Sequence, residues 1–189
     1  MISVVYLFTG KTNEDEEVLI AAGGFDGANI LTSVEVFSPE NNCNGYLPSL
    51  PFPIYGHGLF FMNNTLLACG GDWNHCFELK SHSKKWKIAD KFTMHNPRLM
   101  GAYTISSRGI IYFSGGYPFK DTLEYMDQFK DNWNLLQQNI SRVRHCMVTL
   151  DNGNVVLIGG RGNGHSVKMF DVDQEKFVQL TDITFYLDR

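Results

Sequence analysis

Short apolar runs recur along this chain of 189 residues, and each run ends at a pair of glycines. The pairs begin at residues 23, 70, 115 and 159, so successive pairs lie 47, 45 and 44 residues apart. A nearly constant period of this size is typical of a repeat array. The apolar runs cover residues 18–22, 66–69, 110–114 and 155–158. The pattern therefore predicts several copies of one structural unit.

The third copy shows how one unit is built. Apolar or alternating segments at 101–105, 110–114, 122–126 and 133–136 are separated by short polar turns, which predicts four antiparallel strands in about 45 residues. The second copy has the same order at 59–62, 66–69, 77–79 and 86–88, and the fourth at 146–150, 155–158, 167–170 and 177–180. In the first copy we expect strands at 2–8, 18–22, 34–37 and 46–47, with an exposed acidic turn at 11–17.

The strands of each unit differ in polarity. The second strands are apolar without alternation, which predicts burial on both faces. The third strands alternate better, as at 34–37 and 167–170, which indicates one solvated face. This gradient favours an all-β propeller, in which inner strands are covered by neighbouring sheets and outer strands reach the rim.

An aromatic residue marks the fourth strand of each unit: Tyr46, Trp86, Trp133 and Phe177. With the double glycine before the third strand, this pattern resembles the kelch repeat, in which a fourth-strand Trp packs against the blade. The resemblance covers essentially the whole chain. It implies a kelch-type β-propeller with four blades of four antiparallel strands, at roughly 1–54, 55–97, 98–141 and 142–182 of a single domain spanning 1–189. The first copy departs from the pattern, because two extra residues precede Tyr46.

Kelch-like propellers commonly have six or seven blades, whereas this chain supplies four. We expect the chain to be part of a six- or seven-bladed ring, and a closed four-bladed ring stays open as the alternative. Repeat arrays make contacts between neighbours, so a partial array can still be locally well formed.

The glycine pairs are expected to be structural. Glycine allows positive φ at a strand end and lets another segment approach the backbone closely, and we expect the fourth-strand aromatic residue to fill that space. A phosphate-binding loop would need a following helix and a Lys-Ser/Thr pair, and the sequence has neither after these pairs.

Charge and chemistry point away from several functional classes. A net charge of -4 argues against binding to a nucleic acid backbone. The six histidines lack the short spacing of a zinc site, and His57 and His145 open equivalent strands, which marks them as repeat positions. No sequence-visible set of acids or nucleophiles indicates catalysis. We therefore expect no cofactor, no metal and no enzymatic activity.

The loops are the remaining candidates for function. In a four-stranded meander, the loops between strands two and three emerge on the same face as the connections between blades. Aromatic and arginine residues, which are common at interface hot spots, occur on both sets. We expect this face to bind a protein or peptide partner, and because kelch-like domains often hold acidic segments with arginines of the blade connections, the resemblance implies an acidic ligand. The candidate residues are Phe25, Asp26, Tyr55, Trp73, Asn74, His75, Arg98, Tyr117, Phe119, Lys120, Arg142, Arg144, Arg161, Asn163 and His165. The alternative is that Arg98 and Arg142 stabilise loops through backbone carbonyls.

The cysteines and two glycosylation sequons leave the compartment open between cytoplasmic and extracellular. Cys69 and Cys76 flank a predicted turn between adjacent strands, within reach of a disulfide. The sequons begin at Asn63 and Asn139. They support an alternative function as an extracellular carbohydrate-binding or adhesive propeller. Many intracellular kelch-like proteins recruit substrates to ubiquitin ligases through a separate helical domain, which these 189 residues do not contain.

Overall fold

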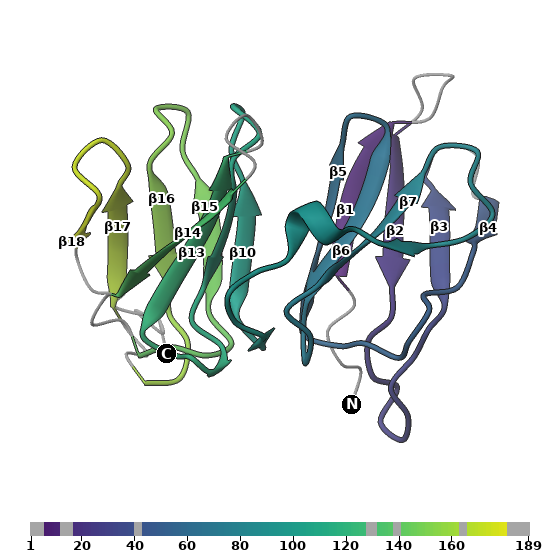
Figure 1. Cartoon of the computed structure of the whole chain (residues 1–189), viewed down its shortest axis with the longest axis horizontal. Coiled ribbons are helices and arrows are strands. Elements are labelled where there is room, and N and C mark those ends of the chain that lie inside the picture. Colours follow the sequence, from purple (N-terminus) through teal and green to yellow (C-terminus); the bar gives the residue numbers. More distant parts are fainter. Residues whose placement is uncertain are drawn as a thin grey trace, which may run out of the picture. The chain divides into compact units, whose positions relative to one another are not determined.

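The computed structural model describes residues 6–11, 17–39, 43–127, 132–137, 141–162 and 166–180. Within these ranges the chain forms four four-stranded antiparallel sheets and no α-helix. It divides into two compact units, Met1–Leu99 and Met100–Arg189, each containing two of the sheets (Figure 1). We call each four-stranded sheet a blade. In the described part of the chain, no helix is long and apolar enough to cross a membrane.

The first unit contains two meanders, in which strands follow one another in sequence order. The first strands of its two blades, β1 and β5, contact each other, as expected for inner strands of adjacent blades. Its elements are β1 (Tyr6–Lys11), β2 (Glu17–Ala22), β3 (Val34–Ser38), β4 (Cys43–Leu47), β5 (His57–Met62), β6 (Thr65–Gly70), β7 (Cys76–Lys80), β8 (Lys87–Ile88), the short 3-10 helix η1 (Asp90–Phe92) and β9 (Arg98–Leu99).

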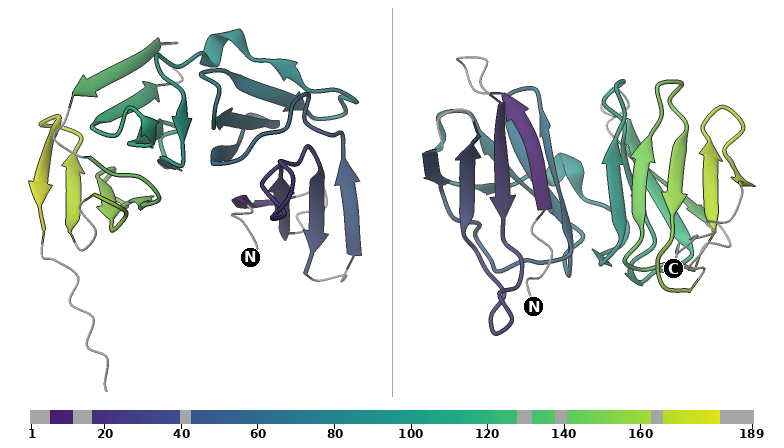
Figure 2. Two further views of the ribbon diagram at one scale, coloured as in Figure 1. Left: turned by 90° about the horizontal axis from the view of Figure 1, so that it is seen from below. Right: turned by 180° about the vertical axis from the view of Figure 1, so that it is seen from behind.

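The second unit repeats this plan, with contacts between the inner strands β10 and β15. Figure 2 shows the meanders from two further directions. The elements of this unit are β10 (Ala102–Ile105), β11 (Ile111–Ser114), β12 (Tyr117–Pro118), β13 (Thr122–Asp127), β14 (Asn132–Gln137), β15 (Cys146–Thr149), β16 (Val155–Ile158), β17 (Val167–Asp171) and β18 (Lys176–Gln179).

The all-β class and the order of four strands in each copy are confirmed. The first strand extends to Lys11, so the expected turn at 11–17 begins later than predicted, and residues 2–5 of that predicted strand lie outside the described ranges. The short elements β9, β12 and η1 were not predicted. The single-domain assignment with its blade limits, and the six- or seven-bladed ring, stay predictions.

The second strands form the centre of each blade. In β6, Leu67, Ala68 and Cys69 are fully buried, and β11 is buried at every position. The third strands are less buried, with half-buried or exposed residues at three of the five positions of β3 and four of the five positions of β17. The burial gradient read from the sequence is therefore present, and burial of apolar surface on both faces of the second strands supplies the main stabilisation of each sheet.

Three of the four fourth-strand aromatic residues pack against their blade. Trp86 is buried and its Nε1 donates a hydrogen bond of 2.6 Å to the carbonyl of Pro48. Trp133 is also buried, and the ring of Phe177 lies 5.0 Å from that of Phe170. Each of these rings lies in a cluster of apolar or aromatic side chains, as expected for the kelch-like position.

Tyr46 is the exception, with 79 % of its surface exposed. It stands opposite Glu35, whereas Leu47 stands opposite the buried Val34. Directly opposed residues of antiparallel strands lie on the same face of the sheet, so Tyr46 lies on the outward face of the sheet together with Glu35. Leu47 packs on the core instead. The expectation that Tyr46 is the equivalent aromatic residue is wrong, because Asn44 stands opposite Phe37 in the position that Trp133 takes opposite Met126.

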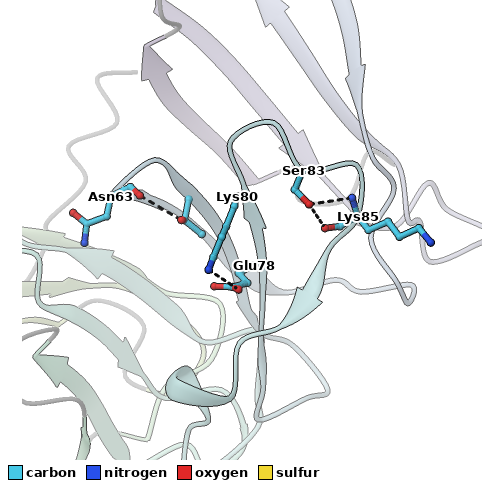
Figure 3. A network of polar contacts seen from close by, with 6 residues as sticks. Asn63, Glu78, Lys80, Ser83 and Lys85 are labelled. Atoms are coloured by element: carbon cyan, nitrogen blue, oxygen red, sulfur yellow. Dashed lines mark hydrogen bonds and ion pairs between the residues drawn. The ribbon is translucent and has the colours of Figure 1, made fainter.

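The blade ends opposite the glycine pairs carry tight hairpin turns. Asn63 and Asn64 have φ of 49° and 57°, the positive values that a two-residue hairpin turn of type I′ requires. Figure 3 shows this end of the second blade, where the Glu78 and Lys80 side chains form an ion pair at 3.6 Å and Ser83 bonds the backbone of Lys85. The short turns at this end leave the longer loops at the opposite end of the blade.

Candidate functional site

The glycine pairs accommodate the backbone of the connections between blades. Gly23 has φ of 58°, and a Cβ atom there would lie 2.5 Å from the carbonyl oxygen of Ile54. Gly115 has φ of 59°, and a Cβ atom would overlap the carbonyl oxygen of Arg142. A connection between blades therefore occupies the space that we had expected the fourth-strand aromatic residue to fill, which corrects that expectation.

In the first unit, the connection at 48–56 is hydrogen-bonded to the loop at 23–33. The amide of Gly24 donates to the carbonyl of Ile54 at 2.8 Å, and the amide of Ile54 donates to the carbonyl of Leu31 at 3.2 Å. Prolines at 48, 51 and 53 restrict φ along the connection. The loop and the connection thus form one rigid layer at the end of the strands.

Aromatic side chains cover this layer. The rings of Phe25 and Tyr55 have centroids 6.5 Å apart, and those of Phe52 and Trp73 are 5.3 Å apart with a 30° interplanar angle. Phe52 is 44 % exposed and Trp73 38 %. We call Phe25, Phe52, Tyr55 and Trp73 the aromatic patch. Since its residues come from three loops, at 23–33, 48–56 and 71–75, the fold of the unit brings them together.

Asp26 builds the tip of the 23–33 loop, which extends beyond the ends of β2 and β3 (Figure 1). Its Oδ1 accepts hydrogen bonds from the amides of Asn29 at 2.7 Å and Ala28 at 2.8 Å. These backbone bonds, that of Asn29 first, lower the pKa of the Asp26 carboxyl. Asp26 is consequently an anion that orders its own loop, and its position is exposed.

Asn74 and His75, from the next loop, are half-buried. The side-chain amide of Asn74 donates to the carbonyl of Met94 at 3.2 Å, and the amide of Met94 donates to the carbonyl of Asn74 at 2.7 Å. Asn74 thus anchors the connection that leaves the second blade. The backbone amide of Arg98 donates to Gly71 at 3.1 Å in the same layer.

Arg142 is buried in the second unit and bonds to the backbone. Its Nη1 donates to the carbonyls of Gly159 at 3.1 Å and Ser166 at 3.0 Å, and its Nη2 donates to the hydroxyl of Ser166. Burial lowers the pKa of this guanidinium. Arg98 is 1 % exposed. Because neither side chain reaches the surface, we correct the candidate set by removing Arg98 and Arg142. Arg142 instead stabilises the loop through backbone carbonyls, as the alternative interpretation of the sequence proposed.

The remaining candidates of the second unit lie at its surface. Tyr117 and Phe119 are exposed, and the Nζ of Lys120 lies 4.5 Å from the centroid of the Tyr117 ring. Arg144 is exposed, with its amide bonded to the carbonyl of Met100 at 2.8 Å, and Arg161 is exposed beside Val143. The candidates Asn163 and His165 lie outside the described residues.

Two equivalent histidines pack beneath these loops. The Cε1 of His57 would lie 3.2 Å from a Cβ atom on Gly23, and that of His145 3.0 Å from one on Gly115. Burial lowers the pKa of His57 to about 4, and His145 Nε2 lies 3.1 Å from the Ser114 hydroxyl. Within the described ranges, His, Cys, Asp and Glu form no group of three or more that could hold a metal ion. In the sequence, the only signal that His57 and His145 pack beneath these loops was their equivalent position in two repeats.

Cys69 and Cys76 stand opposite each other on β6 and β7. The structure joins them in a disulfide, with a Cα–Cα distance of 4.1 Å, and both are buried. Cys146 is a free, exposed cysteine. Asn63 of the first sequon is exposed at a hairpin turn, and Asn139 of the second lies outside the described residues.

Comparisons with known proteins agree with the repeat pattern. The kelch motif model matches residues 15–43. Kelch-like protein 36 of Bos taurus is 24 % identical over 193 residues, covering 89 % of this chain and 30 % of that protein. Kelch-like protein 35 of Mus musculus is 29 % identical over 156 residues, or 76 % of this chain and 25 % of that protein. Spermatocyte protein spe-26 of Caenorhabditis elegans is 45 % identical over 56 residues, 30 % of this chain and 10 % of that protein. The chain thus spans less than a third of the length of each of these relatives.

Proposed function

Because the chain is a kelch-repeat protein, we propose that it is a non-catalytic protein-interaction module that binds its partner through the glycine-pair loops and the connections between blades. Kelch repeats and kelch-like relatives suggest an interaction role, and the family is generally non-catalytic. The proposal assigns that role to particular loops of each unit.

One observation carries the proposal. In both units, exposed aromatic and charged side chains stand on loops whose backbones are fixed by hydrogen bonds to the neighbouring connection, as at Gly24–Ile54 and Gly116–Arg142. Rigid presentation of such side chains lowers the entropy that binding costs. Aromatic residues and arginine also contribute disproportionately to binding energy in protein interfaces.

An acidic partner segment, as expected from the sequence, is supported in the second unit alone. With Arg98 and Arg142 buried, the lysine and arginine residues left in the candidate set are the half-buried Lys120 and the exposed Arg144 and Arg161, all in that unit. Exposed cations steer association with acidic segments and are sensitive to salt. We therefore propose that the loops at 115–121, 141–145 and 159–162 hold the acidic segment.

Affinity capture with the full chain tests this function. Partners captured by the unaltered chain from its native tissue should be lost when Arg144→Glu reverses a loop charge. Arg108→Glu is the matched control, because Arg108 is exposed in the same unit on the turn between β10 and β11, at the opposite blade end. Equal capture by both variants and the unaltered chain would remove the support for this face.

The extracellular alternative, a carbohydrate-binding or adhesive propeller, is favoured by the Cys69–Cys76 disulfide and the exposed Asn63, since disulfides persist mainly in oxidising compartments. Mass spectrometry of native protein alkylated before reduction distinguishes the two functions. An intact disulfide with a glycan on Asn63 supports the extracellular one. Alkylated Cys69 and Cys76 with an unmodified Asn63 eliminate it.

A further inference from the structure

We propose that the aromatic patch of the first unit binds a partner segment that carries a lysine or arginine beside an apolar side chain. This inference rests on the proposed function and specifies the partner chemistry for one of its surfaces. It differs from the acidic segment proposed for the second unit.

Charge gives the first reason. The loops that form the patch, at 23–33, 48–56 and 71–75, contain two carboxylates, Asp26 and Asp72, and no lysine or arginine. Both carboxylates are exposed, and the pKa of Asp26 is lowered. An acidic partner segment would meet like charge here, whereas a cationic one meets opposite charge, and such complementarity determines which partner an interface accepts.

The rings give the second reason. Phe52 and Trp73 leave much of their surface exposed while lying against each other. A cation is attracted to the face of an aromatic ring within about 6 Å of its centroid, and tryptophan is the best such ring. Asp72 is the chain neighbour of Trp73, so a partner ammonium or guanidinium at this ring would also be near a carboxylate.

In the second unit, a lysine of the chain itself makes the corresponding contact between a cation and an aromatic ring. There the loop after the glycine pair supplies its own cation, since Lys120 Nζ lies 4.5 Å from the Tyr117 ring centroid. The corresponding loop of the first unit presents Trp73 without any lysine or arginine in residues 71–75. A partner cation would occupy the position that Lys120 holds in the second unit.

An apolar neighbour of that cation also has a place to bind. Phe52 is 44 % exposed, and its ring centroid lies 5.3 Å from that of Trp73. The hydrogen bonds of the 48–56 connection fix the loops before binding, so little ordering is required. Apolar contact at the exposed Phe52 ring would add to the cation's contact at Trp73.

Selection of phage-displayed random peptides on the full chain tests the inference. We expect enrichment of peptides with lysine or arginine next to an apolar residue. Their affinity, measured by calorimetry, should fall about tenfold in Trp73→Ala. Asp72→Lys leaves the ring in place and should weaken the same peptides by a similar factor. Tyr46→Ala removes an exposed ring from β4 of the same unit and should leave affinity unchanged.

The outcomes separate this inference from the proposed function. Enriched acidic peptides that depend on Arg144 but not on Trp73 would overturn the inference and leave the interaction module standing. Cationic peptides unaffected by both Trp73→Ala and Asp72→Lys would also overturn it. A selection that enriches no peptide, together with partner capture insensitive to Arg144→Glu, would contradict both.

Discussion

The two units share one backbone plan but present opposite charge on equivalent loops. In each, a glycine pair admits the carbonyl of a blade connection, Ile54 in the first unit and Arg142 in the second. The first-unit loops at 23–33, 48–56 and 71–75 carry Asp26 and Asp72 and no lysine or arginine. The equivalent second-unit loops carry one carboxylate, Asp121, besides the half-buried Lys120 and the exposed Arg144 and Arg161. The repeat therefore fixes where the loops lie, and the residues between repeat positions decide what each loop can bind.

The shared plan predicts the largest effect. Gly115→Ala should destabilise the second unit by about 4 kcal/mol, because the residue must keep positive φ and its Cβ would overlap the Arg142 carbonyl. Gly153→Ala is the control: it has φ of 90° but open space around it, so it should cost only about 1–2 kcal/mol. Denaturant unfolding of both variants measures the difference, and equal losses would refute the claim that the connection requires this glycine.

The next effect distinguishes two arginines that lie two residues apart. Arg142→Met should destabilise by about 3 kcal/mol, because the part-buried carbonyls of Gly159 and Ser166 lose the charged donor. Arg144→Met, at an exposed position, should change the free energy of unfolding by less than about 0.5 kcal/mol. The same unfolding measurement applies. If Arg144→Met proved as costly as Arg142→Met, the division between buried and surface arginines would be wrong.

A smaller effect depends on pH and belongs to the first unit. Burial lowers the pKa of His57 to about 4 from 6.5, so the unfolded chain binds more protons between these values. Stability is therefore fully present above the unfolded value and falls as the pH drops toward 4, by at most about 3 kcal/mol. His57→Gln should remove this part of the slope, while His82→Asn, at an exposed turn, should keep it. An unchanged slope in His57→Gln would contradict the assignment.

Much of this arrangement could be predicted from the sequence, since the period of the glycine pairs and the apolar second strands place every blade. The burial of Arg142 could not. In a regular extended segment, side chains two positions apart lie on the same face. Arg144, however, has φ of 55°, and this turns its side chain outward while that of Arg142 points inward. The outward position of Tyr46 likewise depends on its register with Glu35. Such local backbone geometry follows from tertiary contacts and leaves no pattern in one sequence.

In our proposal, equivalent loops of the two units bind partners of opposite charge. Backbone amide chemical shifts of the full chain, recorded by NMR during titration with a lysine-containing apolar peptide and then with a glutamate-rich peptide, test it most directly. The first peptide should shift amides at 23–33, 48–56 and 71–75, and the second those at 115–121, 141–145 and 159–162. Shifts from both peptides in the same loops, or at the hairpin turns of the opposite blade ends, would contradict the account.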